Sequence, residues 1–144
     1  MDPSATNIMT GHVVQSVFEI YSELGFGMFE TVYRTVLFKV LIDLGYTVRR
    51  EVKVPITYRG ITLKRGFRAD LLVNETLIVE VKSIETITDK HYKQVLTYLR
   101  LSGYPLGLLT NFGARWLKGQ IRRVVNGFDG PRPRDEVPVP IELW

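Results

Sequence analysis

The 144-residue sequence contains no cysteine. This absence excludes disulfides, thiolate metal ligands and a cysteine nucleophile, and it fits a reducing compartment. No apolar run approaches the roughly 18 residues that a membrane span needs. The N-terminus also lacks the basic and apolar segments of a signal peptide. The sequence therefore predicts a cytoplasmic protein that does not associate with a membrane.

The residues that are present indicate one folded domain. Hydrophobic residues make up 45% of the chain and charged residues 24%, which is the balance of an ordinary globular protein with a core. The formal net charge is +4. An excess of this size is compatible with a polyanionic partner such as nucleic acid, but many basic proteins bind none.

Hydrophobic spacing predicts a mixed α/β domain built around one sheet, in which Pro55 interrupts a strand. From residue 126 onward the chain has four of its seven prolines, so we expect a domain over residues 1–125 and an extended tail over residues 126–144. The expected helices span 8–24, 29–44 and 88–102. The expected strands span 46–54, 56–58, 61–63, 67–73, 77–83, 106–110 and 115–125.

One predicted strand carries charges among apolar residues. Glu80 and Lys82 are two positions apart and share one face of the strand, while Val79 and Val81 point to the other. An acid and a base in such surroundings are costly unless they are paired or bind something. The alternative is an ordinary solvated strand face, and these residues alone do not decide between the two.

Asp70 joins this pair if the loop over residues 74–76 has three residues. Asp70 then lies opposite Glu80 in a hairpin, with the β-carbons about 4.5–5.5 Å apart. A two-residue loop would instead place the two carboxylates on opposite faces. Two adjacent carboxylates repel each other, and a hard divalent cation such as Mg²⁺ or Mn²⁺ would relieve that repulsion.

Asp70 followed by Glu80-Val81-Lys82 resembles the signature of the PD-(D/E)XK nucleases, with Ala69 in the place of the signature proline. Three further segments strengthen the resemblance, which covers about residues 10–125. Gln94-Val-Leu-Thr-Tyr98 resembles the Gln-x-x-x-Tyr element of RecB-like members. Gly27-Met-Phe-Glu30-Thr-Val-Tyr33 matches the motif that names the GxxExxY family. Residues 107–113 resemble that family's end segment.

The resemblance implies a restriction-endonuclease-like fold, with a mixed sheet flanked by helices and the carboxylates on a bent hairpin. It also implies that a bound Mg²⁺ or Mn²⁺ is held by Asp70, Glu80, the backbone carbonyl of Val81 and Glu30. Lys82 would orient or activate the attacking water. The expected function is hydrolysis of phosphodiester bonds, in DNA rather than RNA.

Helix residues complete the expected site. Gln94 would position Lys82 or the water, and Tyr98 would pack beside the site or touch a phosphate, with Tyr33 as a supporting core residue. Each has a simpler alternative. Glu30 could merely complement the dipole of its helix, and Gln94 could be solvated. His91 could face the site, but we expect the oxygen ligands to hold the metal without it.

Basic residues around the carboxylates could contact phosphates. They could equally be solvated strand edges, because Lys and Arg blunt open edges. The rival to a nuclease is a non-catalytic module of the same fold that serves binding or assembly, for example as a homo-oligomer. The candidate nucleic-acid contacts are Arg49, Arg50, Lys64, Arg65 and Arg68.

Overall fold

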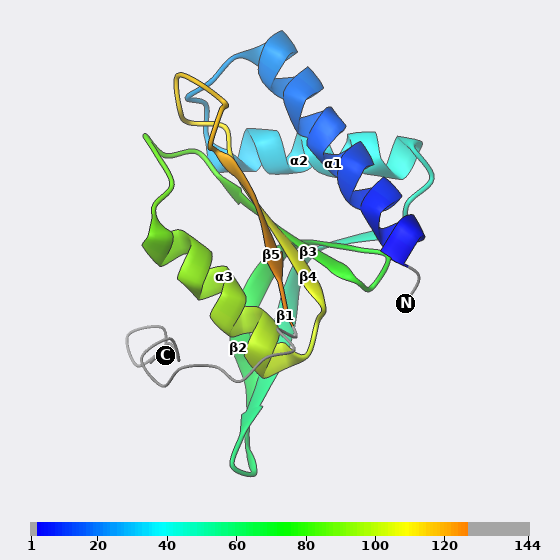
Figure 1. Ribbon diagram of the computed structural model, residues 1–144, viewed down its shortest axis with the longest axis vertical. Coiled ribbons are helices and arrows are strands. Elements are labelled where there is room, and N and C mark those ends of the chain that lie inside the picture. The colour runs from blue at the N-terminus through cyan, green and yellow to red at the C-terminus, as the bar shows by residue number, and fades with distance from the viewer. Residues whose placement is uncertain (1–2, 127–144) are drawn as a thin grey trace.

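The computed structural model describes residues 3–126. This part of the chain forms a five-stranded mixed sheet with the strand order β1-β2-β3-β4-β5, in which only β3 and β4 are parallel (Figure 1). The elements in chain order are α1 (Pro3–Leu24), α2 (Glu30–Asp43), β1 (Val48–Tyr58), β2 (Ile61–Val73), β3 (Leu77–Lys82), α3 (Asp89–Ser102), β4 (Leu106–Asn111) and β5 (Ile121–Val125).

Helices cover both faces of the sheet, so the predicted α/β domain with a mixed sheet flanked by helices is confirmed. On α2, Tyr33, Leu37 and Leu41 recur every four residues and are fully buried, because this spacing keeps them on one face of a helix. They pack with α1 against one face of the sheet. The helix α3 covers the opposite face through Val95 and Leu99.

The hairpin of β1 and β2 changes direction at Asp70. Leu71 belongs to the core beneath α1 and α2, whereas Ala69, two residues earlier, belongs to the core beneath α3. Regular alternation would put both on one face. On β1, Glu51 has a φ of 54°, a conformation that is uncommon for residues other than glycine. The hairpin is therefore bent beside Asp70, as the family resemblance implied.

Beyond this bend, residues 55–65 form a two-stranded arm whose strands pair, within residues 3–126, only with each other. Pro55 was expected to end a strand, but β1 continues through it to Tyr58. The register shifts here, because one residue of β1 lies opposite residues 64–66 of β2. Proline fits such a bulge, where no ladder hydrogen bond is needed from its nitrogen. The predicted strands 61–63 and 67–73 are consequently one strand.

Two other predicted boundaries were wrong. The first helix starts at Pro3 rather than residue 8. The last strand starts at Ile121 rather than residue 115, because the segment before it folds into turns, where the Tyr21 hydroxyl lies 2.8 Å from the carbonyl oxygen of Ala114. The predicted tail, apart from its first residue, lies outside the described residues. Over residues 3–126, no helix combines the length and apolar character that crossing a membrane requires.

Candidate active site

The hairpin between β2 and β3 places the two predicted carboxylates together. Val73 pairs with Leu77, so the loop over residues 74–76 has three residues and the predicted parity is confirmed. The ladder continues for two further pairs. The next residues along the two strands are Asp70 and Glu80. They therefore lie at matching positions of the two strands, where the ladder ends.

The turn that fixes this register is itself anchored. Asn74 and Glu75 have φ values of 51° and 52°, and asparagine tolerates this left-handed conformation better than most residues. The backbone N–H of Asn74 donates to the carbonyl oxygen of Thr47 at 2.7 Å. In return, the N–H of Thr47 donates to the side-chain oxygen of Asn74 at 3.0 Å. The loop is thereby fastened to the residue before β1.

Asp70 is buried and has partners on both carboxylate oxygens. Its Oδ2 accepts the backbone N–H of Val81 at 2.8 Å. Its Oδ1 accepts a hydrogen bond from Arg34 Nη1 at 3.3 Å, and the other arm of that guanidinium pairs with Glu51 at 3.1 Å. Charged partners strengthen such hydrogen bonds. These contacts fix the orientation of the Asp70 carboxylate.

Glu80 differs from Asp70 because its burial is not matched by partners. The residue is 8% exposed, and its Oε1 accepts no hydrogen bond from the described part of the chain. Burial is the main cause that raises the pKa of Glu80 to about 8; the negative charge of Asp70 adds to this rise, and Lys82 opposes it. A buried acceptor without a donor is costly. Glu80 therefore has an oxygen that these residues leave unsatisfied.

The helix α3 forms one wall of the space in front of Glu80. His91, Gln94 and Tyr98 line this space, because positions three and four apart share a helix face. The ring of Tyr98 stacks on Phe67 of β2 with 4.0 Å between centroids. Burial raises the pKa of Tyr98, and the nearby charge of Glu80 adds to this. The phenol is thus held in its neutral, hydrogen-donating form.

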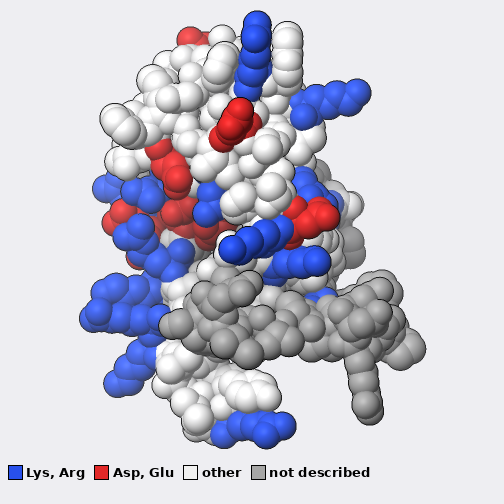
Figure 2. All heavy atoms as spheres, turned by 90° about the vertical axis from the view of Figure 1, so that its left-hand side faces the viewer, with Lys and Arg blue, Asp and Glu red and all other residues white. Residues whose placement is uncertain are grey.

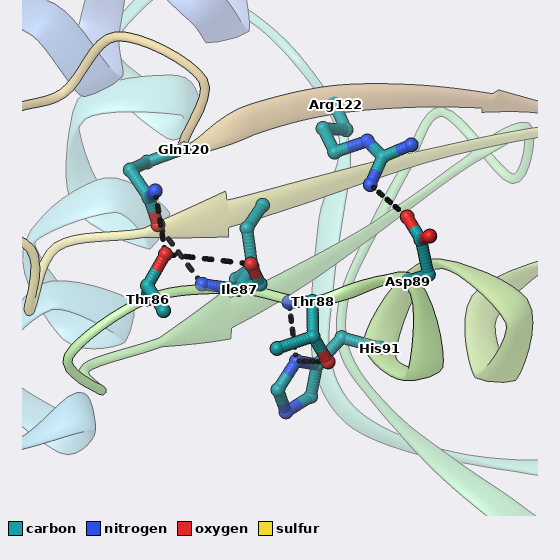
Figure 3. A network of polar contacts seen from close by, with 7 residues as sticks. All are labelled: Thr86, Ile87, Thr88, Asp89, His91, Gln120 and Arg122. Carbon is teal, nitrogen blue, oxygen red and sulfur yellow. Dashed lines mark hydrogen bonds and ion pairs between the residues drawn. The ribbon is translucent and has the colours of Figure 1, made fainter.

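The start of α3 is tied to its surroundings by polar contacts (Figure 3). The backbone N–H of Thr88 donates to His91 Nδ1 at 3.0 Å, which is half of a capping box. The N–H of Ile87 donates to the side chain of Gln120 at 3.0 Å. Arg122 on β5 pairs with the first residue of the helix at 3.2 Å. The face of α3 that carries Gln94 is therefore fixed relative to the sheet.

The start of α2 forms the opposite wall. Glu30 and Arg34 are one helical turn apart and both line the space in front of Glu80. Tyr33 points the other way and is fully buried. Its hydroxyl donates to the carbonyl oxygen of Gly25 at 2.8 Å and accepts the N–H of Met28 at 3.2 Å. Tyr33 thus fixes the link that precedes Glu30 and does not reach the carboxylates.

Together these walls enclose a cleft of about 460 Å³. On this side of the molecule, acidic side chains gather at mid-height, with basic ones beside and below them (Figure 2). The cleft contains every predicted catalytic side chain. Its lining consists of Glu30, Arg34, Gly66, Phe67, Arg68, Asp70, Glu80, Lys82, His91, Gln94, Val95 and Tyr98.

The predicted nucleic-acid contacts divide into two groups. Arg68 lines the cleft, and the other two basic residues of β2 belong to the arm. Arg49 instead pairs with Glu75, with 2.7 Å between its Nε and a carboxylate oxygen. The guanidinium of Arg50 lies 4.7 Å from the ring centroid of Phe38. Neither Arg49 nor Arg50 lines the cleft.

Comparison with known proteins identifies the family. A family model described as the PD-(D/E)XK nuclease superfamily matches residues 7–124. The chain belongs to this superfamily. The match confirms the superfamily and the restriction-endonuclease-like fold that the sequence motifs indicated. No curated protein and no solved structure matches the chain.

Nucleases of the PD-(D/E)XK superfamily normally use divalent metals, so the cleft residues should include ligands that suit such an ion. Over residues 3–126, no three acidic or histidine side chains are grouped closely enough to form a ready-made cation site. The cleft nevertheless offers the buried Glu80 oxygen, which has no donor among these residues, next to Asp70. Carboxylate oxygens are the ligands that Mg²⁺ and Mn²⁺ prefer. The donor set therefore fits a hard cation.

Arg34 is the polar cleft residue that the sequence analysis missed. Its signal was available, because Arg34 follows the predicted site residue Glu30 by four positions and such pairs share a helix face. Gly66 and Phe67 were missed for a different reason. They reach the cleft through the bend and bulge of β2, and neither feature follows from local alternation of polar and apolar residues.

Proposed function

We propose that this PD-(D/E)XK protein hydrolyses phosphodiester bonds in DNA with the help of Mg²⁺ or Mn²⁺. The observation that carries the proposal is the buried oxygen of Glu80 beside Asp70, which the described residues leave unsatisfied. Asp70 and Glu80 would hold the cation, with Glu30 and the backbone carbonyl of Val81 as further ligands. When bound, the cation supplies charge neutralisation and lowers the pKa of water.

The chain's own side chains would perform the remaining tasks. Lys82 lies on the same strand face as Glu80, and its ammonium group would orient the attacking water and donate to the scissile phosphate. Gln94 would hold Lys82 or the water through its amide. Tyr98, fixed by its stacking on Phe67, would donate its hydroxyl to a phosphate oxygen. Arg34 is a positioning residue, because it orients Asp70.

The finer family assignment belongs to the same proposal. We assign the chain to the GxxExxY group and treat residues 94–98 as a RecB-like Gln-x-x-x-Tyr element. Support comes from the geometry of the cleft, since Glu30, Gln94 and Tyr98 all line it although Glu30 lies on α2 and the other two lie on α3. The motifs thus mark residues that meet in space.

Thermal unfolding with and without Mg²⁺ or Mn²⁺ tests the proposed metal site. A ligand that binds only the folded protein stabilises it by about 2.7 kcal/mol at a hundred times its dissociation constant. We expect wild type to gain stability and the double variant Asp70→Asn, Glu80→Gln to gain none. Glu23→Gln, which removes an exposed acid on α1, is the matched control and should respond as wild type does.

Cleavage of supercoiled plasmid and of labelled oligonucleotides completes the test. Wild type and Glu23→Gln should convert substrate only when the metal is present, and the double variant should be inactive at equal concentration of folded protein. A flat thermal response together with no cleavage of DNA or RNA would overturn the proposal. That result would favour the non-catalytic binding or assembly module.

A further inference from the structure

The arm and its base carry a concentrated positive charge. Residues 52–69 include five basic residues and no acidic one. The rest of the chain has 14 basic and 15 acidic residues, so the net positive charge of the protein resides in this segment. The five residues are Lys53, Arg59, Lys64, Arg65 and Arg68, and all five are exposed. A polyanion approaching the protein is drawn to this segment first.

The shape of the arm limits which polyanion fits. The arm projects from the sheet as a ribbon of two strands (Figure 1). It ends in a tight turn at Arg59 and Gly60, whose φ values are 47° and 78°. The major groove of B-form DNA is wide enough to admit a two-stranded ribbon. The major groove of an A-form RNA helix is too narrow for side chains to read.

The bulge joins the arm to the cleft. Residues 64–66 have no direct partners on β1, and the side chain of Ile56 occupies the space above Gly66, where an added β-carbon would lie 2.3 Å from it. Lys64 and Arg65 therefore leave the regular ladder at the base of the arm. The residues that follow the bulge line the cleft, Arg68 among them. Basic side chains thus run from the tip of the arm to the carboxylates.

The two faces of the arm differ in chemistry. Tyr58 and Leu63 share one face with Ile61, and these side chains are 57%, 42% and 64% exposed, respectively. The other face carries the cross-strand pair Thr57 and Thr62. Threonine hydroxyls can bond base edges or phosphates, and apolar side chains can contact thymine methyl groups in the major groove. Such exposed apolar residues otherwise suggest contact with a second protein.

We propose that the substrate is duplex DNA, and that the arm lies in its major groove while one strand of the duplex enters the cleft. This inference rests on the proposed nuclease function and adds the form of the substrate to it. Duplex DNA is favoured over a second copy of this chain as the partner of the arm. The reasons are the positive charge of residues 52–69, the width of the two-stranded ribbon and its continuity with the cleft.

Binding measurements with a shortened arm test the inference. Replacing residues 57–62 by Asn-Gly joins Ile56 to Leu63 through a two-residue turn and retains their pairing, since Asn-Gly favours this type of hairpin. The second variant is Lys64→Gln with Arg65→Gln. The matched control is Lys39→Gln, which removes an exposed cation on α2. Thermal unfolding of each variant should match wild type, because the altered residues contribute little to the cores.

Fluorescence anisotropy would measure affinity for a labelled duplex of about 20 base pairs, two helical turns, and for one of its single strands. The measurements are made in Ca²⁺ and separately in EDTA. We expect both arm variants to bind the duplex at least about tenfold more weakly, with single-strand affinity nearly unchanged. The Gln double variant should also flatten the salt dependence, since each lost phosphate contact removes about 0.9 from its slope. Lys39→Gln should bind as wild type does.

Several results would overturn the inference. Unchanged duplex affinity of the shortened arm would do so, and so would equal losses for duplex and single strand. A wild-type dimer that the shortening converts to a monomer, with DNA affinity unchanged, would identify the arm as an interface between copies. If wild type cuts DNA in any of these cases, the proposed function stands without the inference. If wild type neither binds nor cuts any nucleic acid, both fail.

Discussion

The two faces of β3 show how one strand serves a core and a site. Val79 and Val81 point toward α1 and α2 and are fully buried among apolar neighbours. Glu80 and Lys82, one position along from each, point into the cleft. The valines favour folding by burying apolar surface, whereas Glu80 is buried without a full set of partners among residues 3–126. The apolar face thus stabilises a strand whose other face carries the unfavourably buried carboxyl group of Glu80.

Lys82→Met should produce the largest effect and touch only the charged face. Methionine retains the apolar stem but lacks the ammonium group. We expect cleavage to slow by about a thousandfold, equivalent to about 4 kcal/mol in the activation barrier, because a positioned proton donor or acceptor contributes at this scale. Rates of plasmid cleavage at saturating metal would measure it. Thermal stability should remain close to wild type, and an undiminished rate would exclude Lys82 from the chemistry.

The pH dependence of the free energy of unfolding should reveal the raised pKa of the buried Glu80 carboxyl group. Its pKa is raised from 4.5 to about 8 in the folded protein, so the folded state keeps a proton that the unfolded chain releases in this interval. Stability of the metal-free protein should therefore fall as pH rises from about 4.5 to about 8 and then level off, by about 5 kcal/mol in all.

Denaturant unfolding of wild type and Glu80→Gln across this range isolates the contribution. The glutamine variant lacks the titrating group, so the difference between the two proteins should decline with pH as described. Burial lowers the pKa of His91, with Lys82 and Lys90 adding to the effect. This shift gives stability a weak opposite slope, which is common to both proteins and cancels in the difference. A difference independent of pH would contradict the raised pKa.

Val79→Ala should damage only the apolar face. The change removes two fully buried methyl groups and should lower the free energy of unfolding by about 2 kcal/mol. Chemical denaturation would measure the loss. Cleavage per folded molecule should remain at the wild-type level, because the side chain points away from the cleft. A variant that loses activity at full stability would show that the two faces are not separable.

Arg49→Ala should have the smallest effect. Arg49 pairs with Glu75 in solvent, with side chains 50% and 55% exposed, and exposed pairs of this kind contribute about 0.5 kcal/mol or less. The free energy of unfolding and the duplex affinity should both stay near wild type. A marked loss of DNA affinity would instead show that Arg49 contacts DNA, and that the DNA-binding surface extends beyond the arm and the cleft.

Local patterns in the sequence were sufficient for the elements and for the register of the main hairpin. Helical spacing located α2 and α3, and the three-residue loop over 74–76 correctly aligned Asp70 with Glu80. These predictions succeeded because each depends on residues close together in the chain. The family motifs then supplied Glu30, Gln94 and Tyr98, whose meeting in the cleft no local pattern would have revealed.

Several of the misses share a physical cause, because they depend on contacts between parts of the chain that are separated in sequence. Pro55 lies in a continuous strand because a bulge on β2 lies opposite it, ten residues further along the chain. The last strand is shorter than predicted because Tyr21, far away in sequence, holds the preceding turns. Arg49 and Arg50 have partners outside the cleft, and their predicted contacts with nucleic acid stay a prediction. Propensity and spacing carry no information about such partners.

Asn111, at the end of β4, is a residue at which we expect few substitutions to be tolerated. It is fully buried, and its amide oxygen accepts from the backbone N–H groups of Ile84 and Gly113 at 3.0 Å each. Its nitrogen donates to the Ile84 carbonyl at 3.0 Å and to Gln120 at 2.8 Å. Aspartate would lose both donors and leucine would satisfy none of these groups. Selection at this position therefore acts on architecture, and invariance among descendants would report the shape of the loop before α3 rather than catalysis.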